Sequence, residues 1–444
     1  MTAHEKRAAA KKRPTKDPRE QITARALIVW SAAVAVYVAA ITSRTSFGVA
    51  GVAAMDRFQV DASRIAAFTA VQVGTYAIAQ IPAGLLIDRF GPRRLLVAGA
   101  LVMGTGQVIL GLTTNYAVAI GARVLIGAGD AMAFLSVMRL LPYWFPLRHA
   151  PVFAQVSAGL GQLGQFISAV PFLALLGARG WVVSFVSLGT AMLVVAGAAA
   201  VAISDTPDPV AAAEARRMGP KTTLKHRLKA VLSHPVGWQA FFIHFASLVP
   251  QAIFTLLWGV PLMTQAMGLS DAQAGAALTV NTLAVIAASP LFGVISSRLG
   301  TQRDFVVIAI VVINIASWLV FFGSESPRGF AAAVLINLML GTCTPVSNFG
   351  FDYVRERMPR ENVATGTGVG NMGGFTAAMI AAQLMGFVLA HSAAAPGALE
   401  WQDFRASWLV LVAIMAIGLV AVAASGLAMR RHARAQAGGS QPRK

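Results

Sequence analysis

Three charged residues stand inside stretches of sequence that are otherwise apolar. Arg44 lies in the apolar run 26–53, and Arg123 and Asp130 lie in the run 117–141. A charge in hydrocarbon is expensive, so such residues are typical of substrate sites, ion pathways and proton relays. Because a guanidinium matches a carboxylate or phosphate through two parallel hydrogen bonds, we expect Arg44 to bind an anionic substrate.

Asp130 is the acidic residue placed deepest in an apolar run. A carboxyl removed from water favours its neutral form, so Asp130 is a candidate proton-coupling residue. The alternative is a permanently ionised carboxylate that pairs with Arg44 or another base. Arg123 precedes Asp130 by seven residues, which places both on one face of a helix, about 10 Å apart. We interpret Arg123 as a second coupling residue, with a role in helix contacts alone as the alternative.

The elements that must position these residues are membrane-spanning helices. Of the 444 residues, 56% are hydrophobic and 12% are charged. A span needs about 20 apolar residues, and it must be helical because lipid offers no partner for backbone groups. Twelve such runs are present, at 26–53, 65–87, 95–113, 117–141, 151–175, 182–203, 236–262, 273–296, 305–323, 329–350, 364–390 and 407–429.

Composition and motifs exclude several classes of function. The net charge is +18, but the basic residues form short clusters between apolar runs, so we predict no nucleic-acid partner. The lone Cys343 excludes an internal disulfide and an all-cysteine metal site. No catalytic motif such as HExxH or GxSxG is present. We therefore predict that the protein is not an enzyme and needs no cofactor or metal.

Lys and Arg are distributed unequally between the two sides of the predicted membrane. Outside the spans, 28 fall on the side of the termini and 5 on the other. By the positive-inside rule both termini are cytoplasmic, in a cell (inner or plasma) membrane. The predicted order is a basic tail 1–25, a six-helix bundle 26–203, a linker 204–235, a second six-helix bundle 236–429 and a basic tail 430–444. Residues 211–232 of the linker have the composition of a basic amphipathic helix at the membrane surface.

A basic turn occurs twice in the chain. Gly84-Leu-Leu-Ile-Asp-Arg-Phe-Gly91 recurs as Gly293-Val-Ile-Ser-Ser-Arg-Leu-Gly300, and both glycine pairs are 209 residues apart. Gly161-Gln162 and Gly370-Asn371 show the same offset. These repeats predict two similar halves that meet around a central site, as in transporters that work by alternating access.

The repeated turn resembles the signature loop of the major facilitator superfamily, Gly-x-x-x-Asp-Arg-x-Gly followed by two basic residues. Here Pro92 replaces one basic residue, and Ser297 replaces the acid in the second copy. Arg123-x-x-x-Gly127-x-Gly129 is similar to a second motif of the family. The resemblance implies an all-α fold of twelve transmembrane helices in two pseudo-symmetric bundles. Arg44, Tyr76, the sequence Gln80-Ile-Pro and Trp144-Phe-Pro resemble, more weakly, the anion:cation symporter branch.

The resemblance also implies a gate at the cytoplasmic side. Asp88 is expected to engage the N-terminal end of the eleventh span, near Gly366, when that side is closed. From the charges at the helix ends we further predict two mirrored ion pairs, Asp88–Arg139 and Arg298–Asp352. The alternative is that these groups reach the interface independently. The full set of candidate gate residues is Gly84, Asp88, Arg89, Gly91, Arg93, Arg139, Arg298 and Asp352.

We expect the first half to supply the charge that binds the substrate. The second half would supply hydrogen bonds and an aromatic wall. The candidate substrate-binding residues are Arg44, Tyr76, Gln162, Thr255, Trp258 and Asn371. Each polar residue of this set has a helix-packing hydrogen bond as its alternative role.

We therefore predict a monomeric secondary transporter that moves a small organic anion together with H⁺ across the bilayer. One alternative is a proton antiporter for drugs or other amphipathic compounds. An alternative of another class is a membrane receptor or sensor that does not transport.

Overall fold

The computed structural model describes residues 21–60, 62–208, 223–392 and 399–439, and the described residues form helices joined by short turns. The first half contains α2 (Ala24–Val49), α3 (Gly51–Phe58), α4 (Ala62–Phe90), α5 (Pro92–Leu112), α6 (Tyr116–Trp144), α7 (Ala150–Ile167) and α8 (Leu173–Ala202). The second half contains α10 (Leu224–Ser233), α11 (Pro235–Ile253), α12 (Gly259–Pro261), α13 (Asp271–Leu299), α14 (Arg303–Phe321), α15 (Phe330–Cys343), α16 (Phe349–Arg357), α17 (Val363–Ser392) and α18 (Trp401–Gly439).

Ten apolar helical stretches in the described residues are long enough to cross a membrane. Two of them, Ala150–Ala202 and Ala272–Phe321, contain two spans each. The first is broken at Gly180, whose φ of 75° is left-handed, and the second at Gly300, with φ 50°. Counting each broken stretch as two accounts for the twelve predicted spans. The predicted tails and the linker helix fall partly on residues 1–20, 209–222 and 440–444, outside the described residues.

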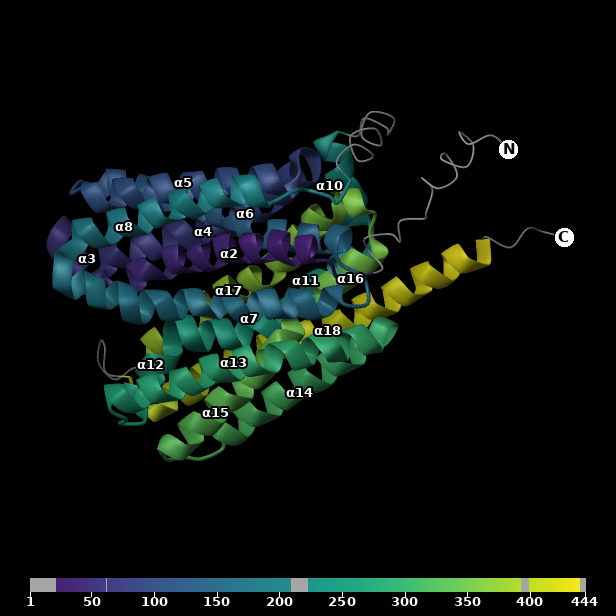
Figure 1. The fold of residues 1–444 in the computed structure, drawn as a ribbon. Coiled ribbons are helices and arrows are strands. Elements are labelled where there is room, and N and C mark those ends of the chain that lie inside the picture. Colours follow the sequence, from purple (N-terminus) through teal and green to yellow (C-terminus); the bar gives the residue numbers. More distant parts are fainter. Residues whose placement is uncertain (1–20, 61, 209–222, 393–398, 440–444) are drawn as a thin grey trace, which may run out of the picture.

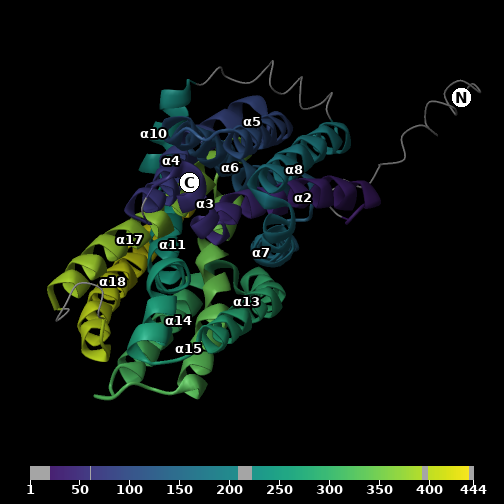
Figure 2. The same cartoon turned by 90° about the vertical axis from the view of Figure 1, so that its left-hand side faces the viewer.

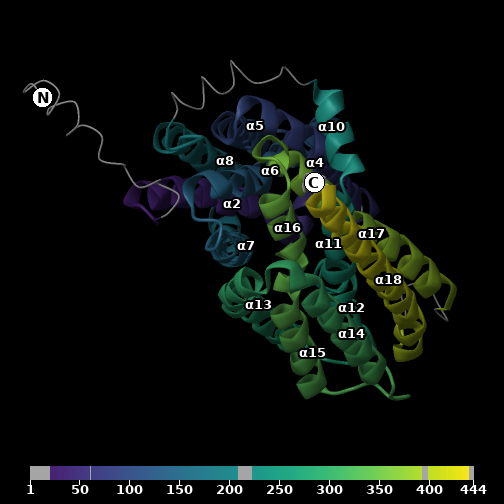
Figure 3. The same cartoon turned by 90° about the vertical axis from the view of Figure 1, so that its right-hand side faces the viewer.

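The helices form two bundles that lie side by side (Figure 1). Buried apolar side chains gather in two clusters, one built almost wholly from residues 26–203 and the other from residues 231–429. The start of α2 and the end of α18 lie at the same end of the molecule, which we call the basic end (Figure 1). Figures 2 and 3 view the molecule from its two ends and show α2 and α4–α8 grouped apart from α13–α15 and α18. The predicted domain bounds themselves stay predictions.

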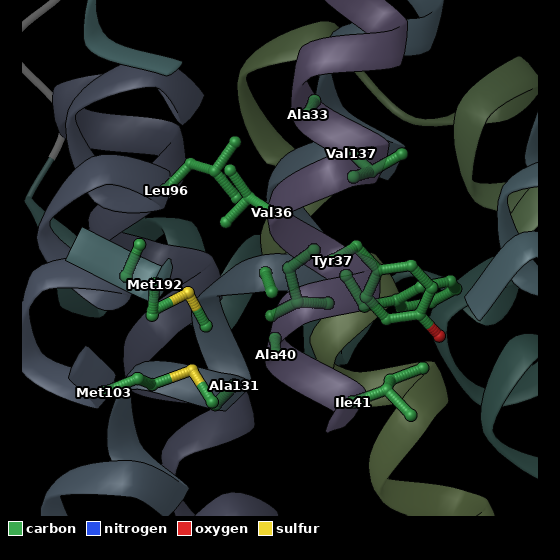
Figure 4. Close-up of a cluster of buried hydrophobic side chains, with 14 of the residues drawn as sticks. Ala33, Val36, Tyr37, Ala40, Ile41, Leu96, Met103, Ala131, Val137 and Met192 are labelled. Carbon is green, nitrogen blue, oxygen red and sulfur yellow. The ribbon is translucent and has the colours of Figure 1, made fainter. Parts of the chain in front are cut away.

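Small residues let the helices of the first bundle approach closely. The core around α2 combines alanines with larger side chains from α5, α6 and α8 (Figure 4). At the α5–α6 crossing, a Cβ on Gly129 would lie 2.5 Å from the carbonyl oxygen of Gly99, and a Cβ on Gly99 would lie 2.8 Å from that of Gly129. Only glycine fits this crossing, so Gly127-Ala-Gly129 has a packing role that explains the pattern of the motif.

Arginines at the end opposite the basic end cap helix C-termini. Arg57 donates to the carbonyl oxygens of Gly111, Leu112 and Thr113 at the end of α5, at 3.0, 3.2 and 2.9 Å. Arg328 bonds the last carbonyls of α14 in the same way. The last carbonyls of a helix have no partner within it and carry partial negative charge. The carbonyl groups at these helix ends therefore hold both arginines in place.

We predict that Gly129→Ala destabilises the protein, because the new methyl group would press against the backbone of α5. Overpacking of this kind costs about 1–3 kcal/mol. Gly121→Ala on the same helix is the matched control, since a Cβ there has no atom within 4 Å. Thermal unfolding of the purified proteins measures both, and equal unfolding temperatures for the two variants would contradict the packing assignment.

Candidate functional site: a central ion pair and the seam between the bundles

Arg44 of α2 and Asp130 of α6 form a two-point ion pair. The Arg44 Nε atom donates to Asp130 Oδ2 at 2.6 Å, and Nη2 donates to Oδ1 at 2.9 Å. The Asp130 side chain is fully buried, whereas 27% of the Arg44 side chain is exposed. The carboxylate is thus closed off from solvent, whereas part of the Arg44 side chain remains accessible. The structure thus pairs Asp130 with Arg44 in this conformation, and the role of Asp130 in proton coupling stays a prediction.

Arg123 is also buried but lacks such a partner. Its side chain is 1% exposed and lies over the ring of Phe47, 4.6 Å from the centroid. Among the described residues, its Nε and Nη1 atoms have no hydrogen-bond partner. The aromatic face offers attraction to a cation. The structure therefore places Arg123 in the same bundle as the central pair without bonding it to Asp130.

Tyr76 and Asn371 connect the central pair to the second bundle. The Tyr76 ring lies under the Arg44 guanidinium, with 4.6 Å between the Arg44 Cζ atom and the ring centroid. The Tyr76 hydroxyl accepts a hydrogen bond from the Asn371 amide at 3.0 Å, and the same amide donates to Gln80 Oε1 at 2.9 Å. Tyr76 and Asn371 are both about 5% exposed. In this conformation the two side chains are hydrogen-bonded to each other and are not accessible to a substrate.

The other candidate substrate residues lie apart from this group. Gln162 is half-buried and accepts a hydrogen bond from Gln165 on its own helix. Thr255 donates to the carbonyl of Gln251 one turn earlier. Trp258 is half-buried, and its indole N–H has no partner among the described residues. Their roles in substrate binding stay predictions.

Asp88 forms the ion pair with Arg139 that the charge pattern predicted, with 2.9 Å between Asp88 Oδ1 and Arg139 Nε. It also accepts hydrogen bonds across the interface. The backbone N–H groups of Ala364 and Thr365 donate to it at 3.1 and 2.7 Å, and the Thr365 hydroxyl donates at 2.7 Å. These residues begin α17, so the carboxylate meets the positive end of that helix. One buried acid therefore binds α6 of its own bundle and α17 of the other.

The rest of the first loop supports Asp88. A Cβ on Gly84 would lie 2.7 Å from the Ala364 carbonyl oxygen, so only glycine allows this approach. Gly91 has a φ of 94° and is the N-cap residue that precedes α5. Arg93 donates through its backbone to Asp205 at 2.8 Å and through its side chain to the Ala200 carbonyl at the end of α8. Arg93 therefore ties the loop to its own bundle, and the exposed Arg89 lies over the ring of Phe90.

The predicted pair Arg298–Asp352 is wrong. Asp352 pairs instead with Arg355 one turn later on α16 and accepts a hydrogen bond from the Ser296 hydroxyl. Arg298 is exposed and, among the described residues, has no ion pair. The reason is the rotation of α13 about its axis, which places Ser296 rather than Arg298 on the buried face at the end of this helix.

Arg303 takes the place expected for Arg298. Its Nη1 and Nη2 atoms donate to the two oxygens of Glu356 at 2.6 and 2.5 Å, and its Nε atom donates to the Ser296 hydroxyl at 2.7 Å. Arg303 is 1% exposed. The sequence contained a signal for it, because Arg303 follows Arg94 by the same 209 residues as the two loops.

A second contact between the bundles was missed by the sequence analysis. Gln155 of α7 is fully buried, donates to the Pro345 carbonyl at 2.8 Å and accepts from the Asn348 amide at 3.1 Å. Beside it, a Cβ on Gly293 would lie 2.7 Å from the Val152 Cα atom. In both halves of the repeat, a glycine allows a helix of the other bundle to approach closely. The polar contact beside Gly293 is made by a neutral amide, whereas the one beside Gly84 is made by an acid.

Comparison with known proteins agrees with this architecture. The sequence profile of the Major Facilitator Superfamily matches residues 33–263 and again 241–443. The chain belongs to this superfamily. Membership in this superfamily indicates a multi-pass membrane transporter rather than an enzyme.

Individual relatives are distant. A probable sulfoacetate transporter of Cupriavidus necator is 29% identical over 118 residues, which is 27% of each chain. A probable L-galactonate transporter of Escherichia coli is 28% identical over 177 residues, which is 40% of this chain and 38% of that protein. The chain thus aligns with well under half of the length of either relative. The solved structure of the Escherichia coli fucose:proton symporter matches with a TM-score of 0.65 at 13% identity, over 89% of this chain and 99% of that one.

Arg303 and Arg298, both in the second loop, provide a test of the contacts that Arg303 makes with Glu356 and Ser296. We predict that Arg303→Ala lowers the stability of this transporter by about 3 kcal/mol, because removal of one partner leaves Glu356 and Ser296 without it. Arg298→Ala in the same loop is the control and should leave the unfolding temperature unchanged. Unfolding in detergent measures both, and a larger effect at Arg298 would contradict the assignment.

Proposed function

We propose that this transporter moves a small organic anion together with a proton by alternating access, with its basic end in the cytosol. The orientation rests on the 28 to 5 distribution of Lys and Arg outside the spans and on the positive-inside rule. The observation that carries the proposed chemistry is the central Arg44–Asp130 pair.

The geometry makes the substrate and Asp130 competitors for one guanidinium. Asp130 occupies Nε and Nη2 of Arg44, which are atoms that a bidentate carboxylate or sulfonate would use. When a proton binds to Asp130, its carboxyl no longer holds Arg44 as an anion does. Arg44 is then available to a substrate anion. The anion and the proton therefore bind together, and departure of both restores the ion pair.

Burial supports this exchange. Because the Asp130 side chain is fully buried and that of Arg44 is 27% exposed, an anion can approach Arg44 from the exposed side and take its guanidinium over from a neutral Asp130. A monoanion that travels with one proton adds no net charge to the central site. Since each uncompensated charge in hydrocarbon is expensive, coupled binding gives the lower-energy route across the membrane.

We assign the closure of the cytosolic side to the contacts at the basic end. Asp88 holds the start of α17, and Gln155 holds the segment Pro345–Asn348. Both contacts join one bundle to the other, so rocking of the bundles must break them. In this arrangement the substrate would reach Arg44 from the opposite side.

The substrate class also draws on relatives. Two transporters with similar sequences are named for sulfoacetate and L-galactonate, both of which are organic anions. Carboxylate and sulfonate groups can each form two hydrogen bonds with the Arg44 guanidinium once Asp130 releases it. Thermal stabilisation of the purified protein by organic anions, sugars and cationic amphipathic compounds separates the alternatives. Stabilisation by cationic compounds alone would favour a drug antiporter and contradict the anion site.

We predict that Asp130→Asn abolishes proton-driven accumulation but retains exchange of substrate across the membrane. The amide keeps the shape of a protonated carboxyl and cannot release a proton, so the site stays competent for the anion. Proteoliposomes that contain the best-stabilising anion measure both activities, accumulation under an imposed pH gradient and counterflow without one. Unchanged accumulation would show that the coupling proton binds elsewhere.

Arg44→Ala is the companion variant and should lose anion binding by about tenfold or more, as expected for a charged hydrogen-bonding group. Arg44→Lys keeps the charge but not the two-point geometry, and it should recover only part of the loss. Unchanged affinity in Arg44→Ala would contradict the proposed anion site.

A further inference from the structure

One face of α4 forms a continuous seam against α17. Tyr76, Gln80, Gly84 and Asp88 recur every four residues, which places them on one side of the helix. Tyr76 meets Phe375, Gln80 meets Asn371 and Gly368, and both Gly84 and Asp88 meet the pair Ala364–Thr365 at the start of α17. The seam therefore runs from the basic end to the centre of the molecule.

Each position of the seam makes a different contact. At the basic end Asp88 accepts three hydrogen bonds from the start of α17. A Cβ on Gly84 would touch the same turn, and a Cβ on Gly368 would lie 2.6 Å from the Gln80 carbonyl oxygen. The Gln80 side chain accepts from Asn371 at 2.9 Å. Close backbone approach and buried hydrogen bonds thus alternate along the seam.

Tyr76 closes the seam at its central end and has contacts on three sides. Its ring packs edge-on against Phe375, with 4.8 Å between centroids. Its hydroxyl accepts from Asn371 at 3.0 Å. The Arg44 guanidinium lies over the same ring at 4.6 Å. One side chain therefore touches both the proposed anion-binding arginine and the opposite bundle.

The equivalent seam between α7 and α13 is not built this way. The 209-residue offset places Val285 at the position of Tyr76 and Gln162 at that of Asn371. Val285 has no hydroxyl, and Gln162 is bonded by Gln165 within its own bundle. The connection from the central charge to the opposite bundle is therefore particular to the α4–α17 seam.

We propose that Tyr76 is a positioning residue that links the charge state of the Arg44–Asp130 pair to closure of the basic end. Arg44 lies over the ring while Asp130 holds it, and the ring keeps its hydroxyl on Asn371. When Arg44 turns to an anion, the ring loses the contact that positions it, so the hydroxyl can move away from Asn371 and its hydrogen bond to α17 breaks more readily. The seam then opens from its centre, and the Asp88 contact is the last to break.

The link to an anion rests on the proposed function, but the coupling itself can be measured without a ligand. The experiment places one spin label in each copy of the loop, at the exposed positions Arg94 and Gln302, in a Cys343→Ala background in lipid nanodiscs. The distribution of distances between the labels reports the ratio of closed to open basic ends. Tyr76→Phe keeps the ring and removes the hydroxyl, so we expect this ratio to fall about three- to tenfold.

Tyr37→Phe is the matched control. Tyr37 is a buried tyrosine near Arg44, but its ring packs on Phe134 of the same bundle, at 5.5 Å between centroids. The control should leave the distance distribution unchanged. Asn371→Ala removes the same hydrogen bond from the other side and should reproduce the effect of Tyr76→Phe. An equal shift in Tyr37→Phe and Tyr76→Phe would overturn the proposal.

A double-mutant cycle tests whether Tyr76 transmits the central charge. The pair is neutralised without leaving a lone charge by Arg44→Gln together with Asp130→Asn. Neutralisation should shift the closed-to-open ratio when Tyr76 is present. In a Tyr76→Leu background, the shift caused by neutralisation should be at least threefold smaller. Additive effects of the two changes would overturn the proposal. If the cycle is coupled while Arg44→Ala retains anion affinity, the proposed function fails and the role of Tyr76 stands.

Discussion

Hydrocarbon offers no partner for a charge, and this constraint organises the interior of the transporter. A buried arginine or aspartate that obtains its partner from another helix fixes the two helices relative to each other. Arg44 and Asp130 join α2 to α6, Asp88 and Arg139 join α4 to α6, and the Arg303–Glu356 pair joins α14 to α16. The apolar residues supply most of the burial, but these pairs decide which faces of the helices meet.

The same constraint makes some of these pairs able to change. Asp88 has Arg139 as a permanent neighbour within its bundle, so its contacts with α17 can break without leaving a bare charge. Arg44 is the opposite case, because its side chain is partly exposed and its partner is fully buried. In the mechanism that we propose, a second anion replaces Asp130 at Arg44 only when Asp130 is neutralised. Pairing thus stabilises the fold at Asp88, and the proposed function gives the pair at Arg44 a role in exchange.

Comparison of the two halves shows which features of the repeat are preserved by packing. Gly84 and Gly293 both allow a backbone of the opposite bundle to approach within the reach of a Cβ, and neither can be replaced without a steric clash. The acid of the first loop has no such geometric requirement in the second, where Ser297 stands in its place. There the bundles are joined by the Gln155 amide instead. Close backbone contact is the conserved constraint within this chain, and the polar group that accompanies it differs.

The amino-acid sequence by itself determined the helices and their duplication. Hydropathy and the positions of Gly180, Gly300 and the repeated loop are local properties, so twelve spans, two like halves and the Asp88–Arg139 pair could be predicted from them. The sequence did not decide whether Asp130 is paired or which arginine of the second loop is buried. Those outcomes depend on the rotation of helix ends: the turn at Gly300 exposes Arg298 and brings Arg303 to Glu356. Only the tertiary structure sets that rotation, because it arises from packing against helices that are distant in the chain.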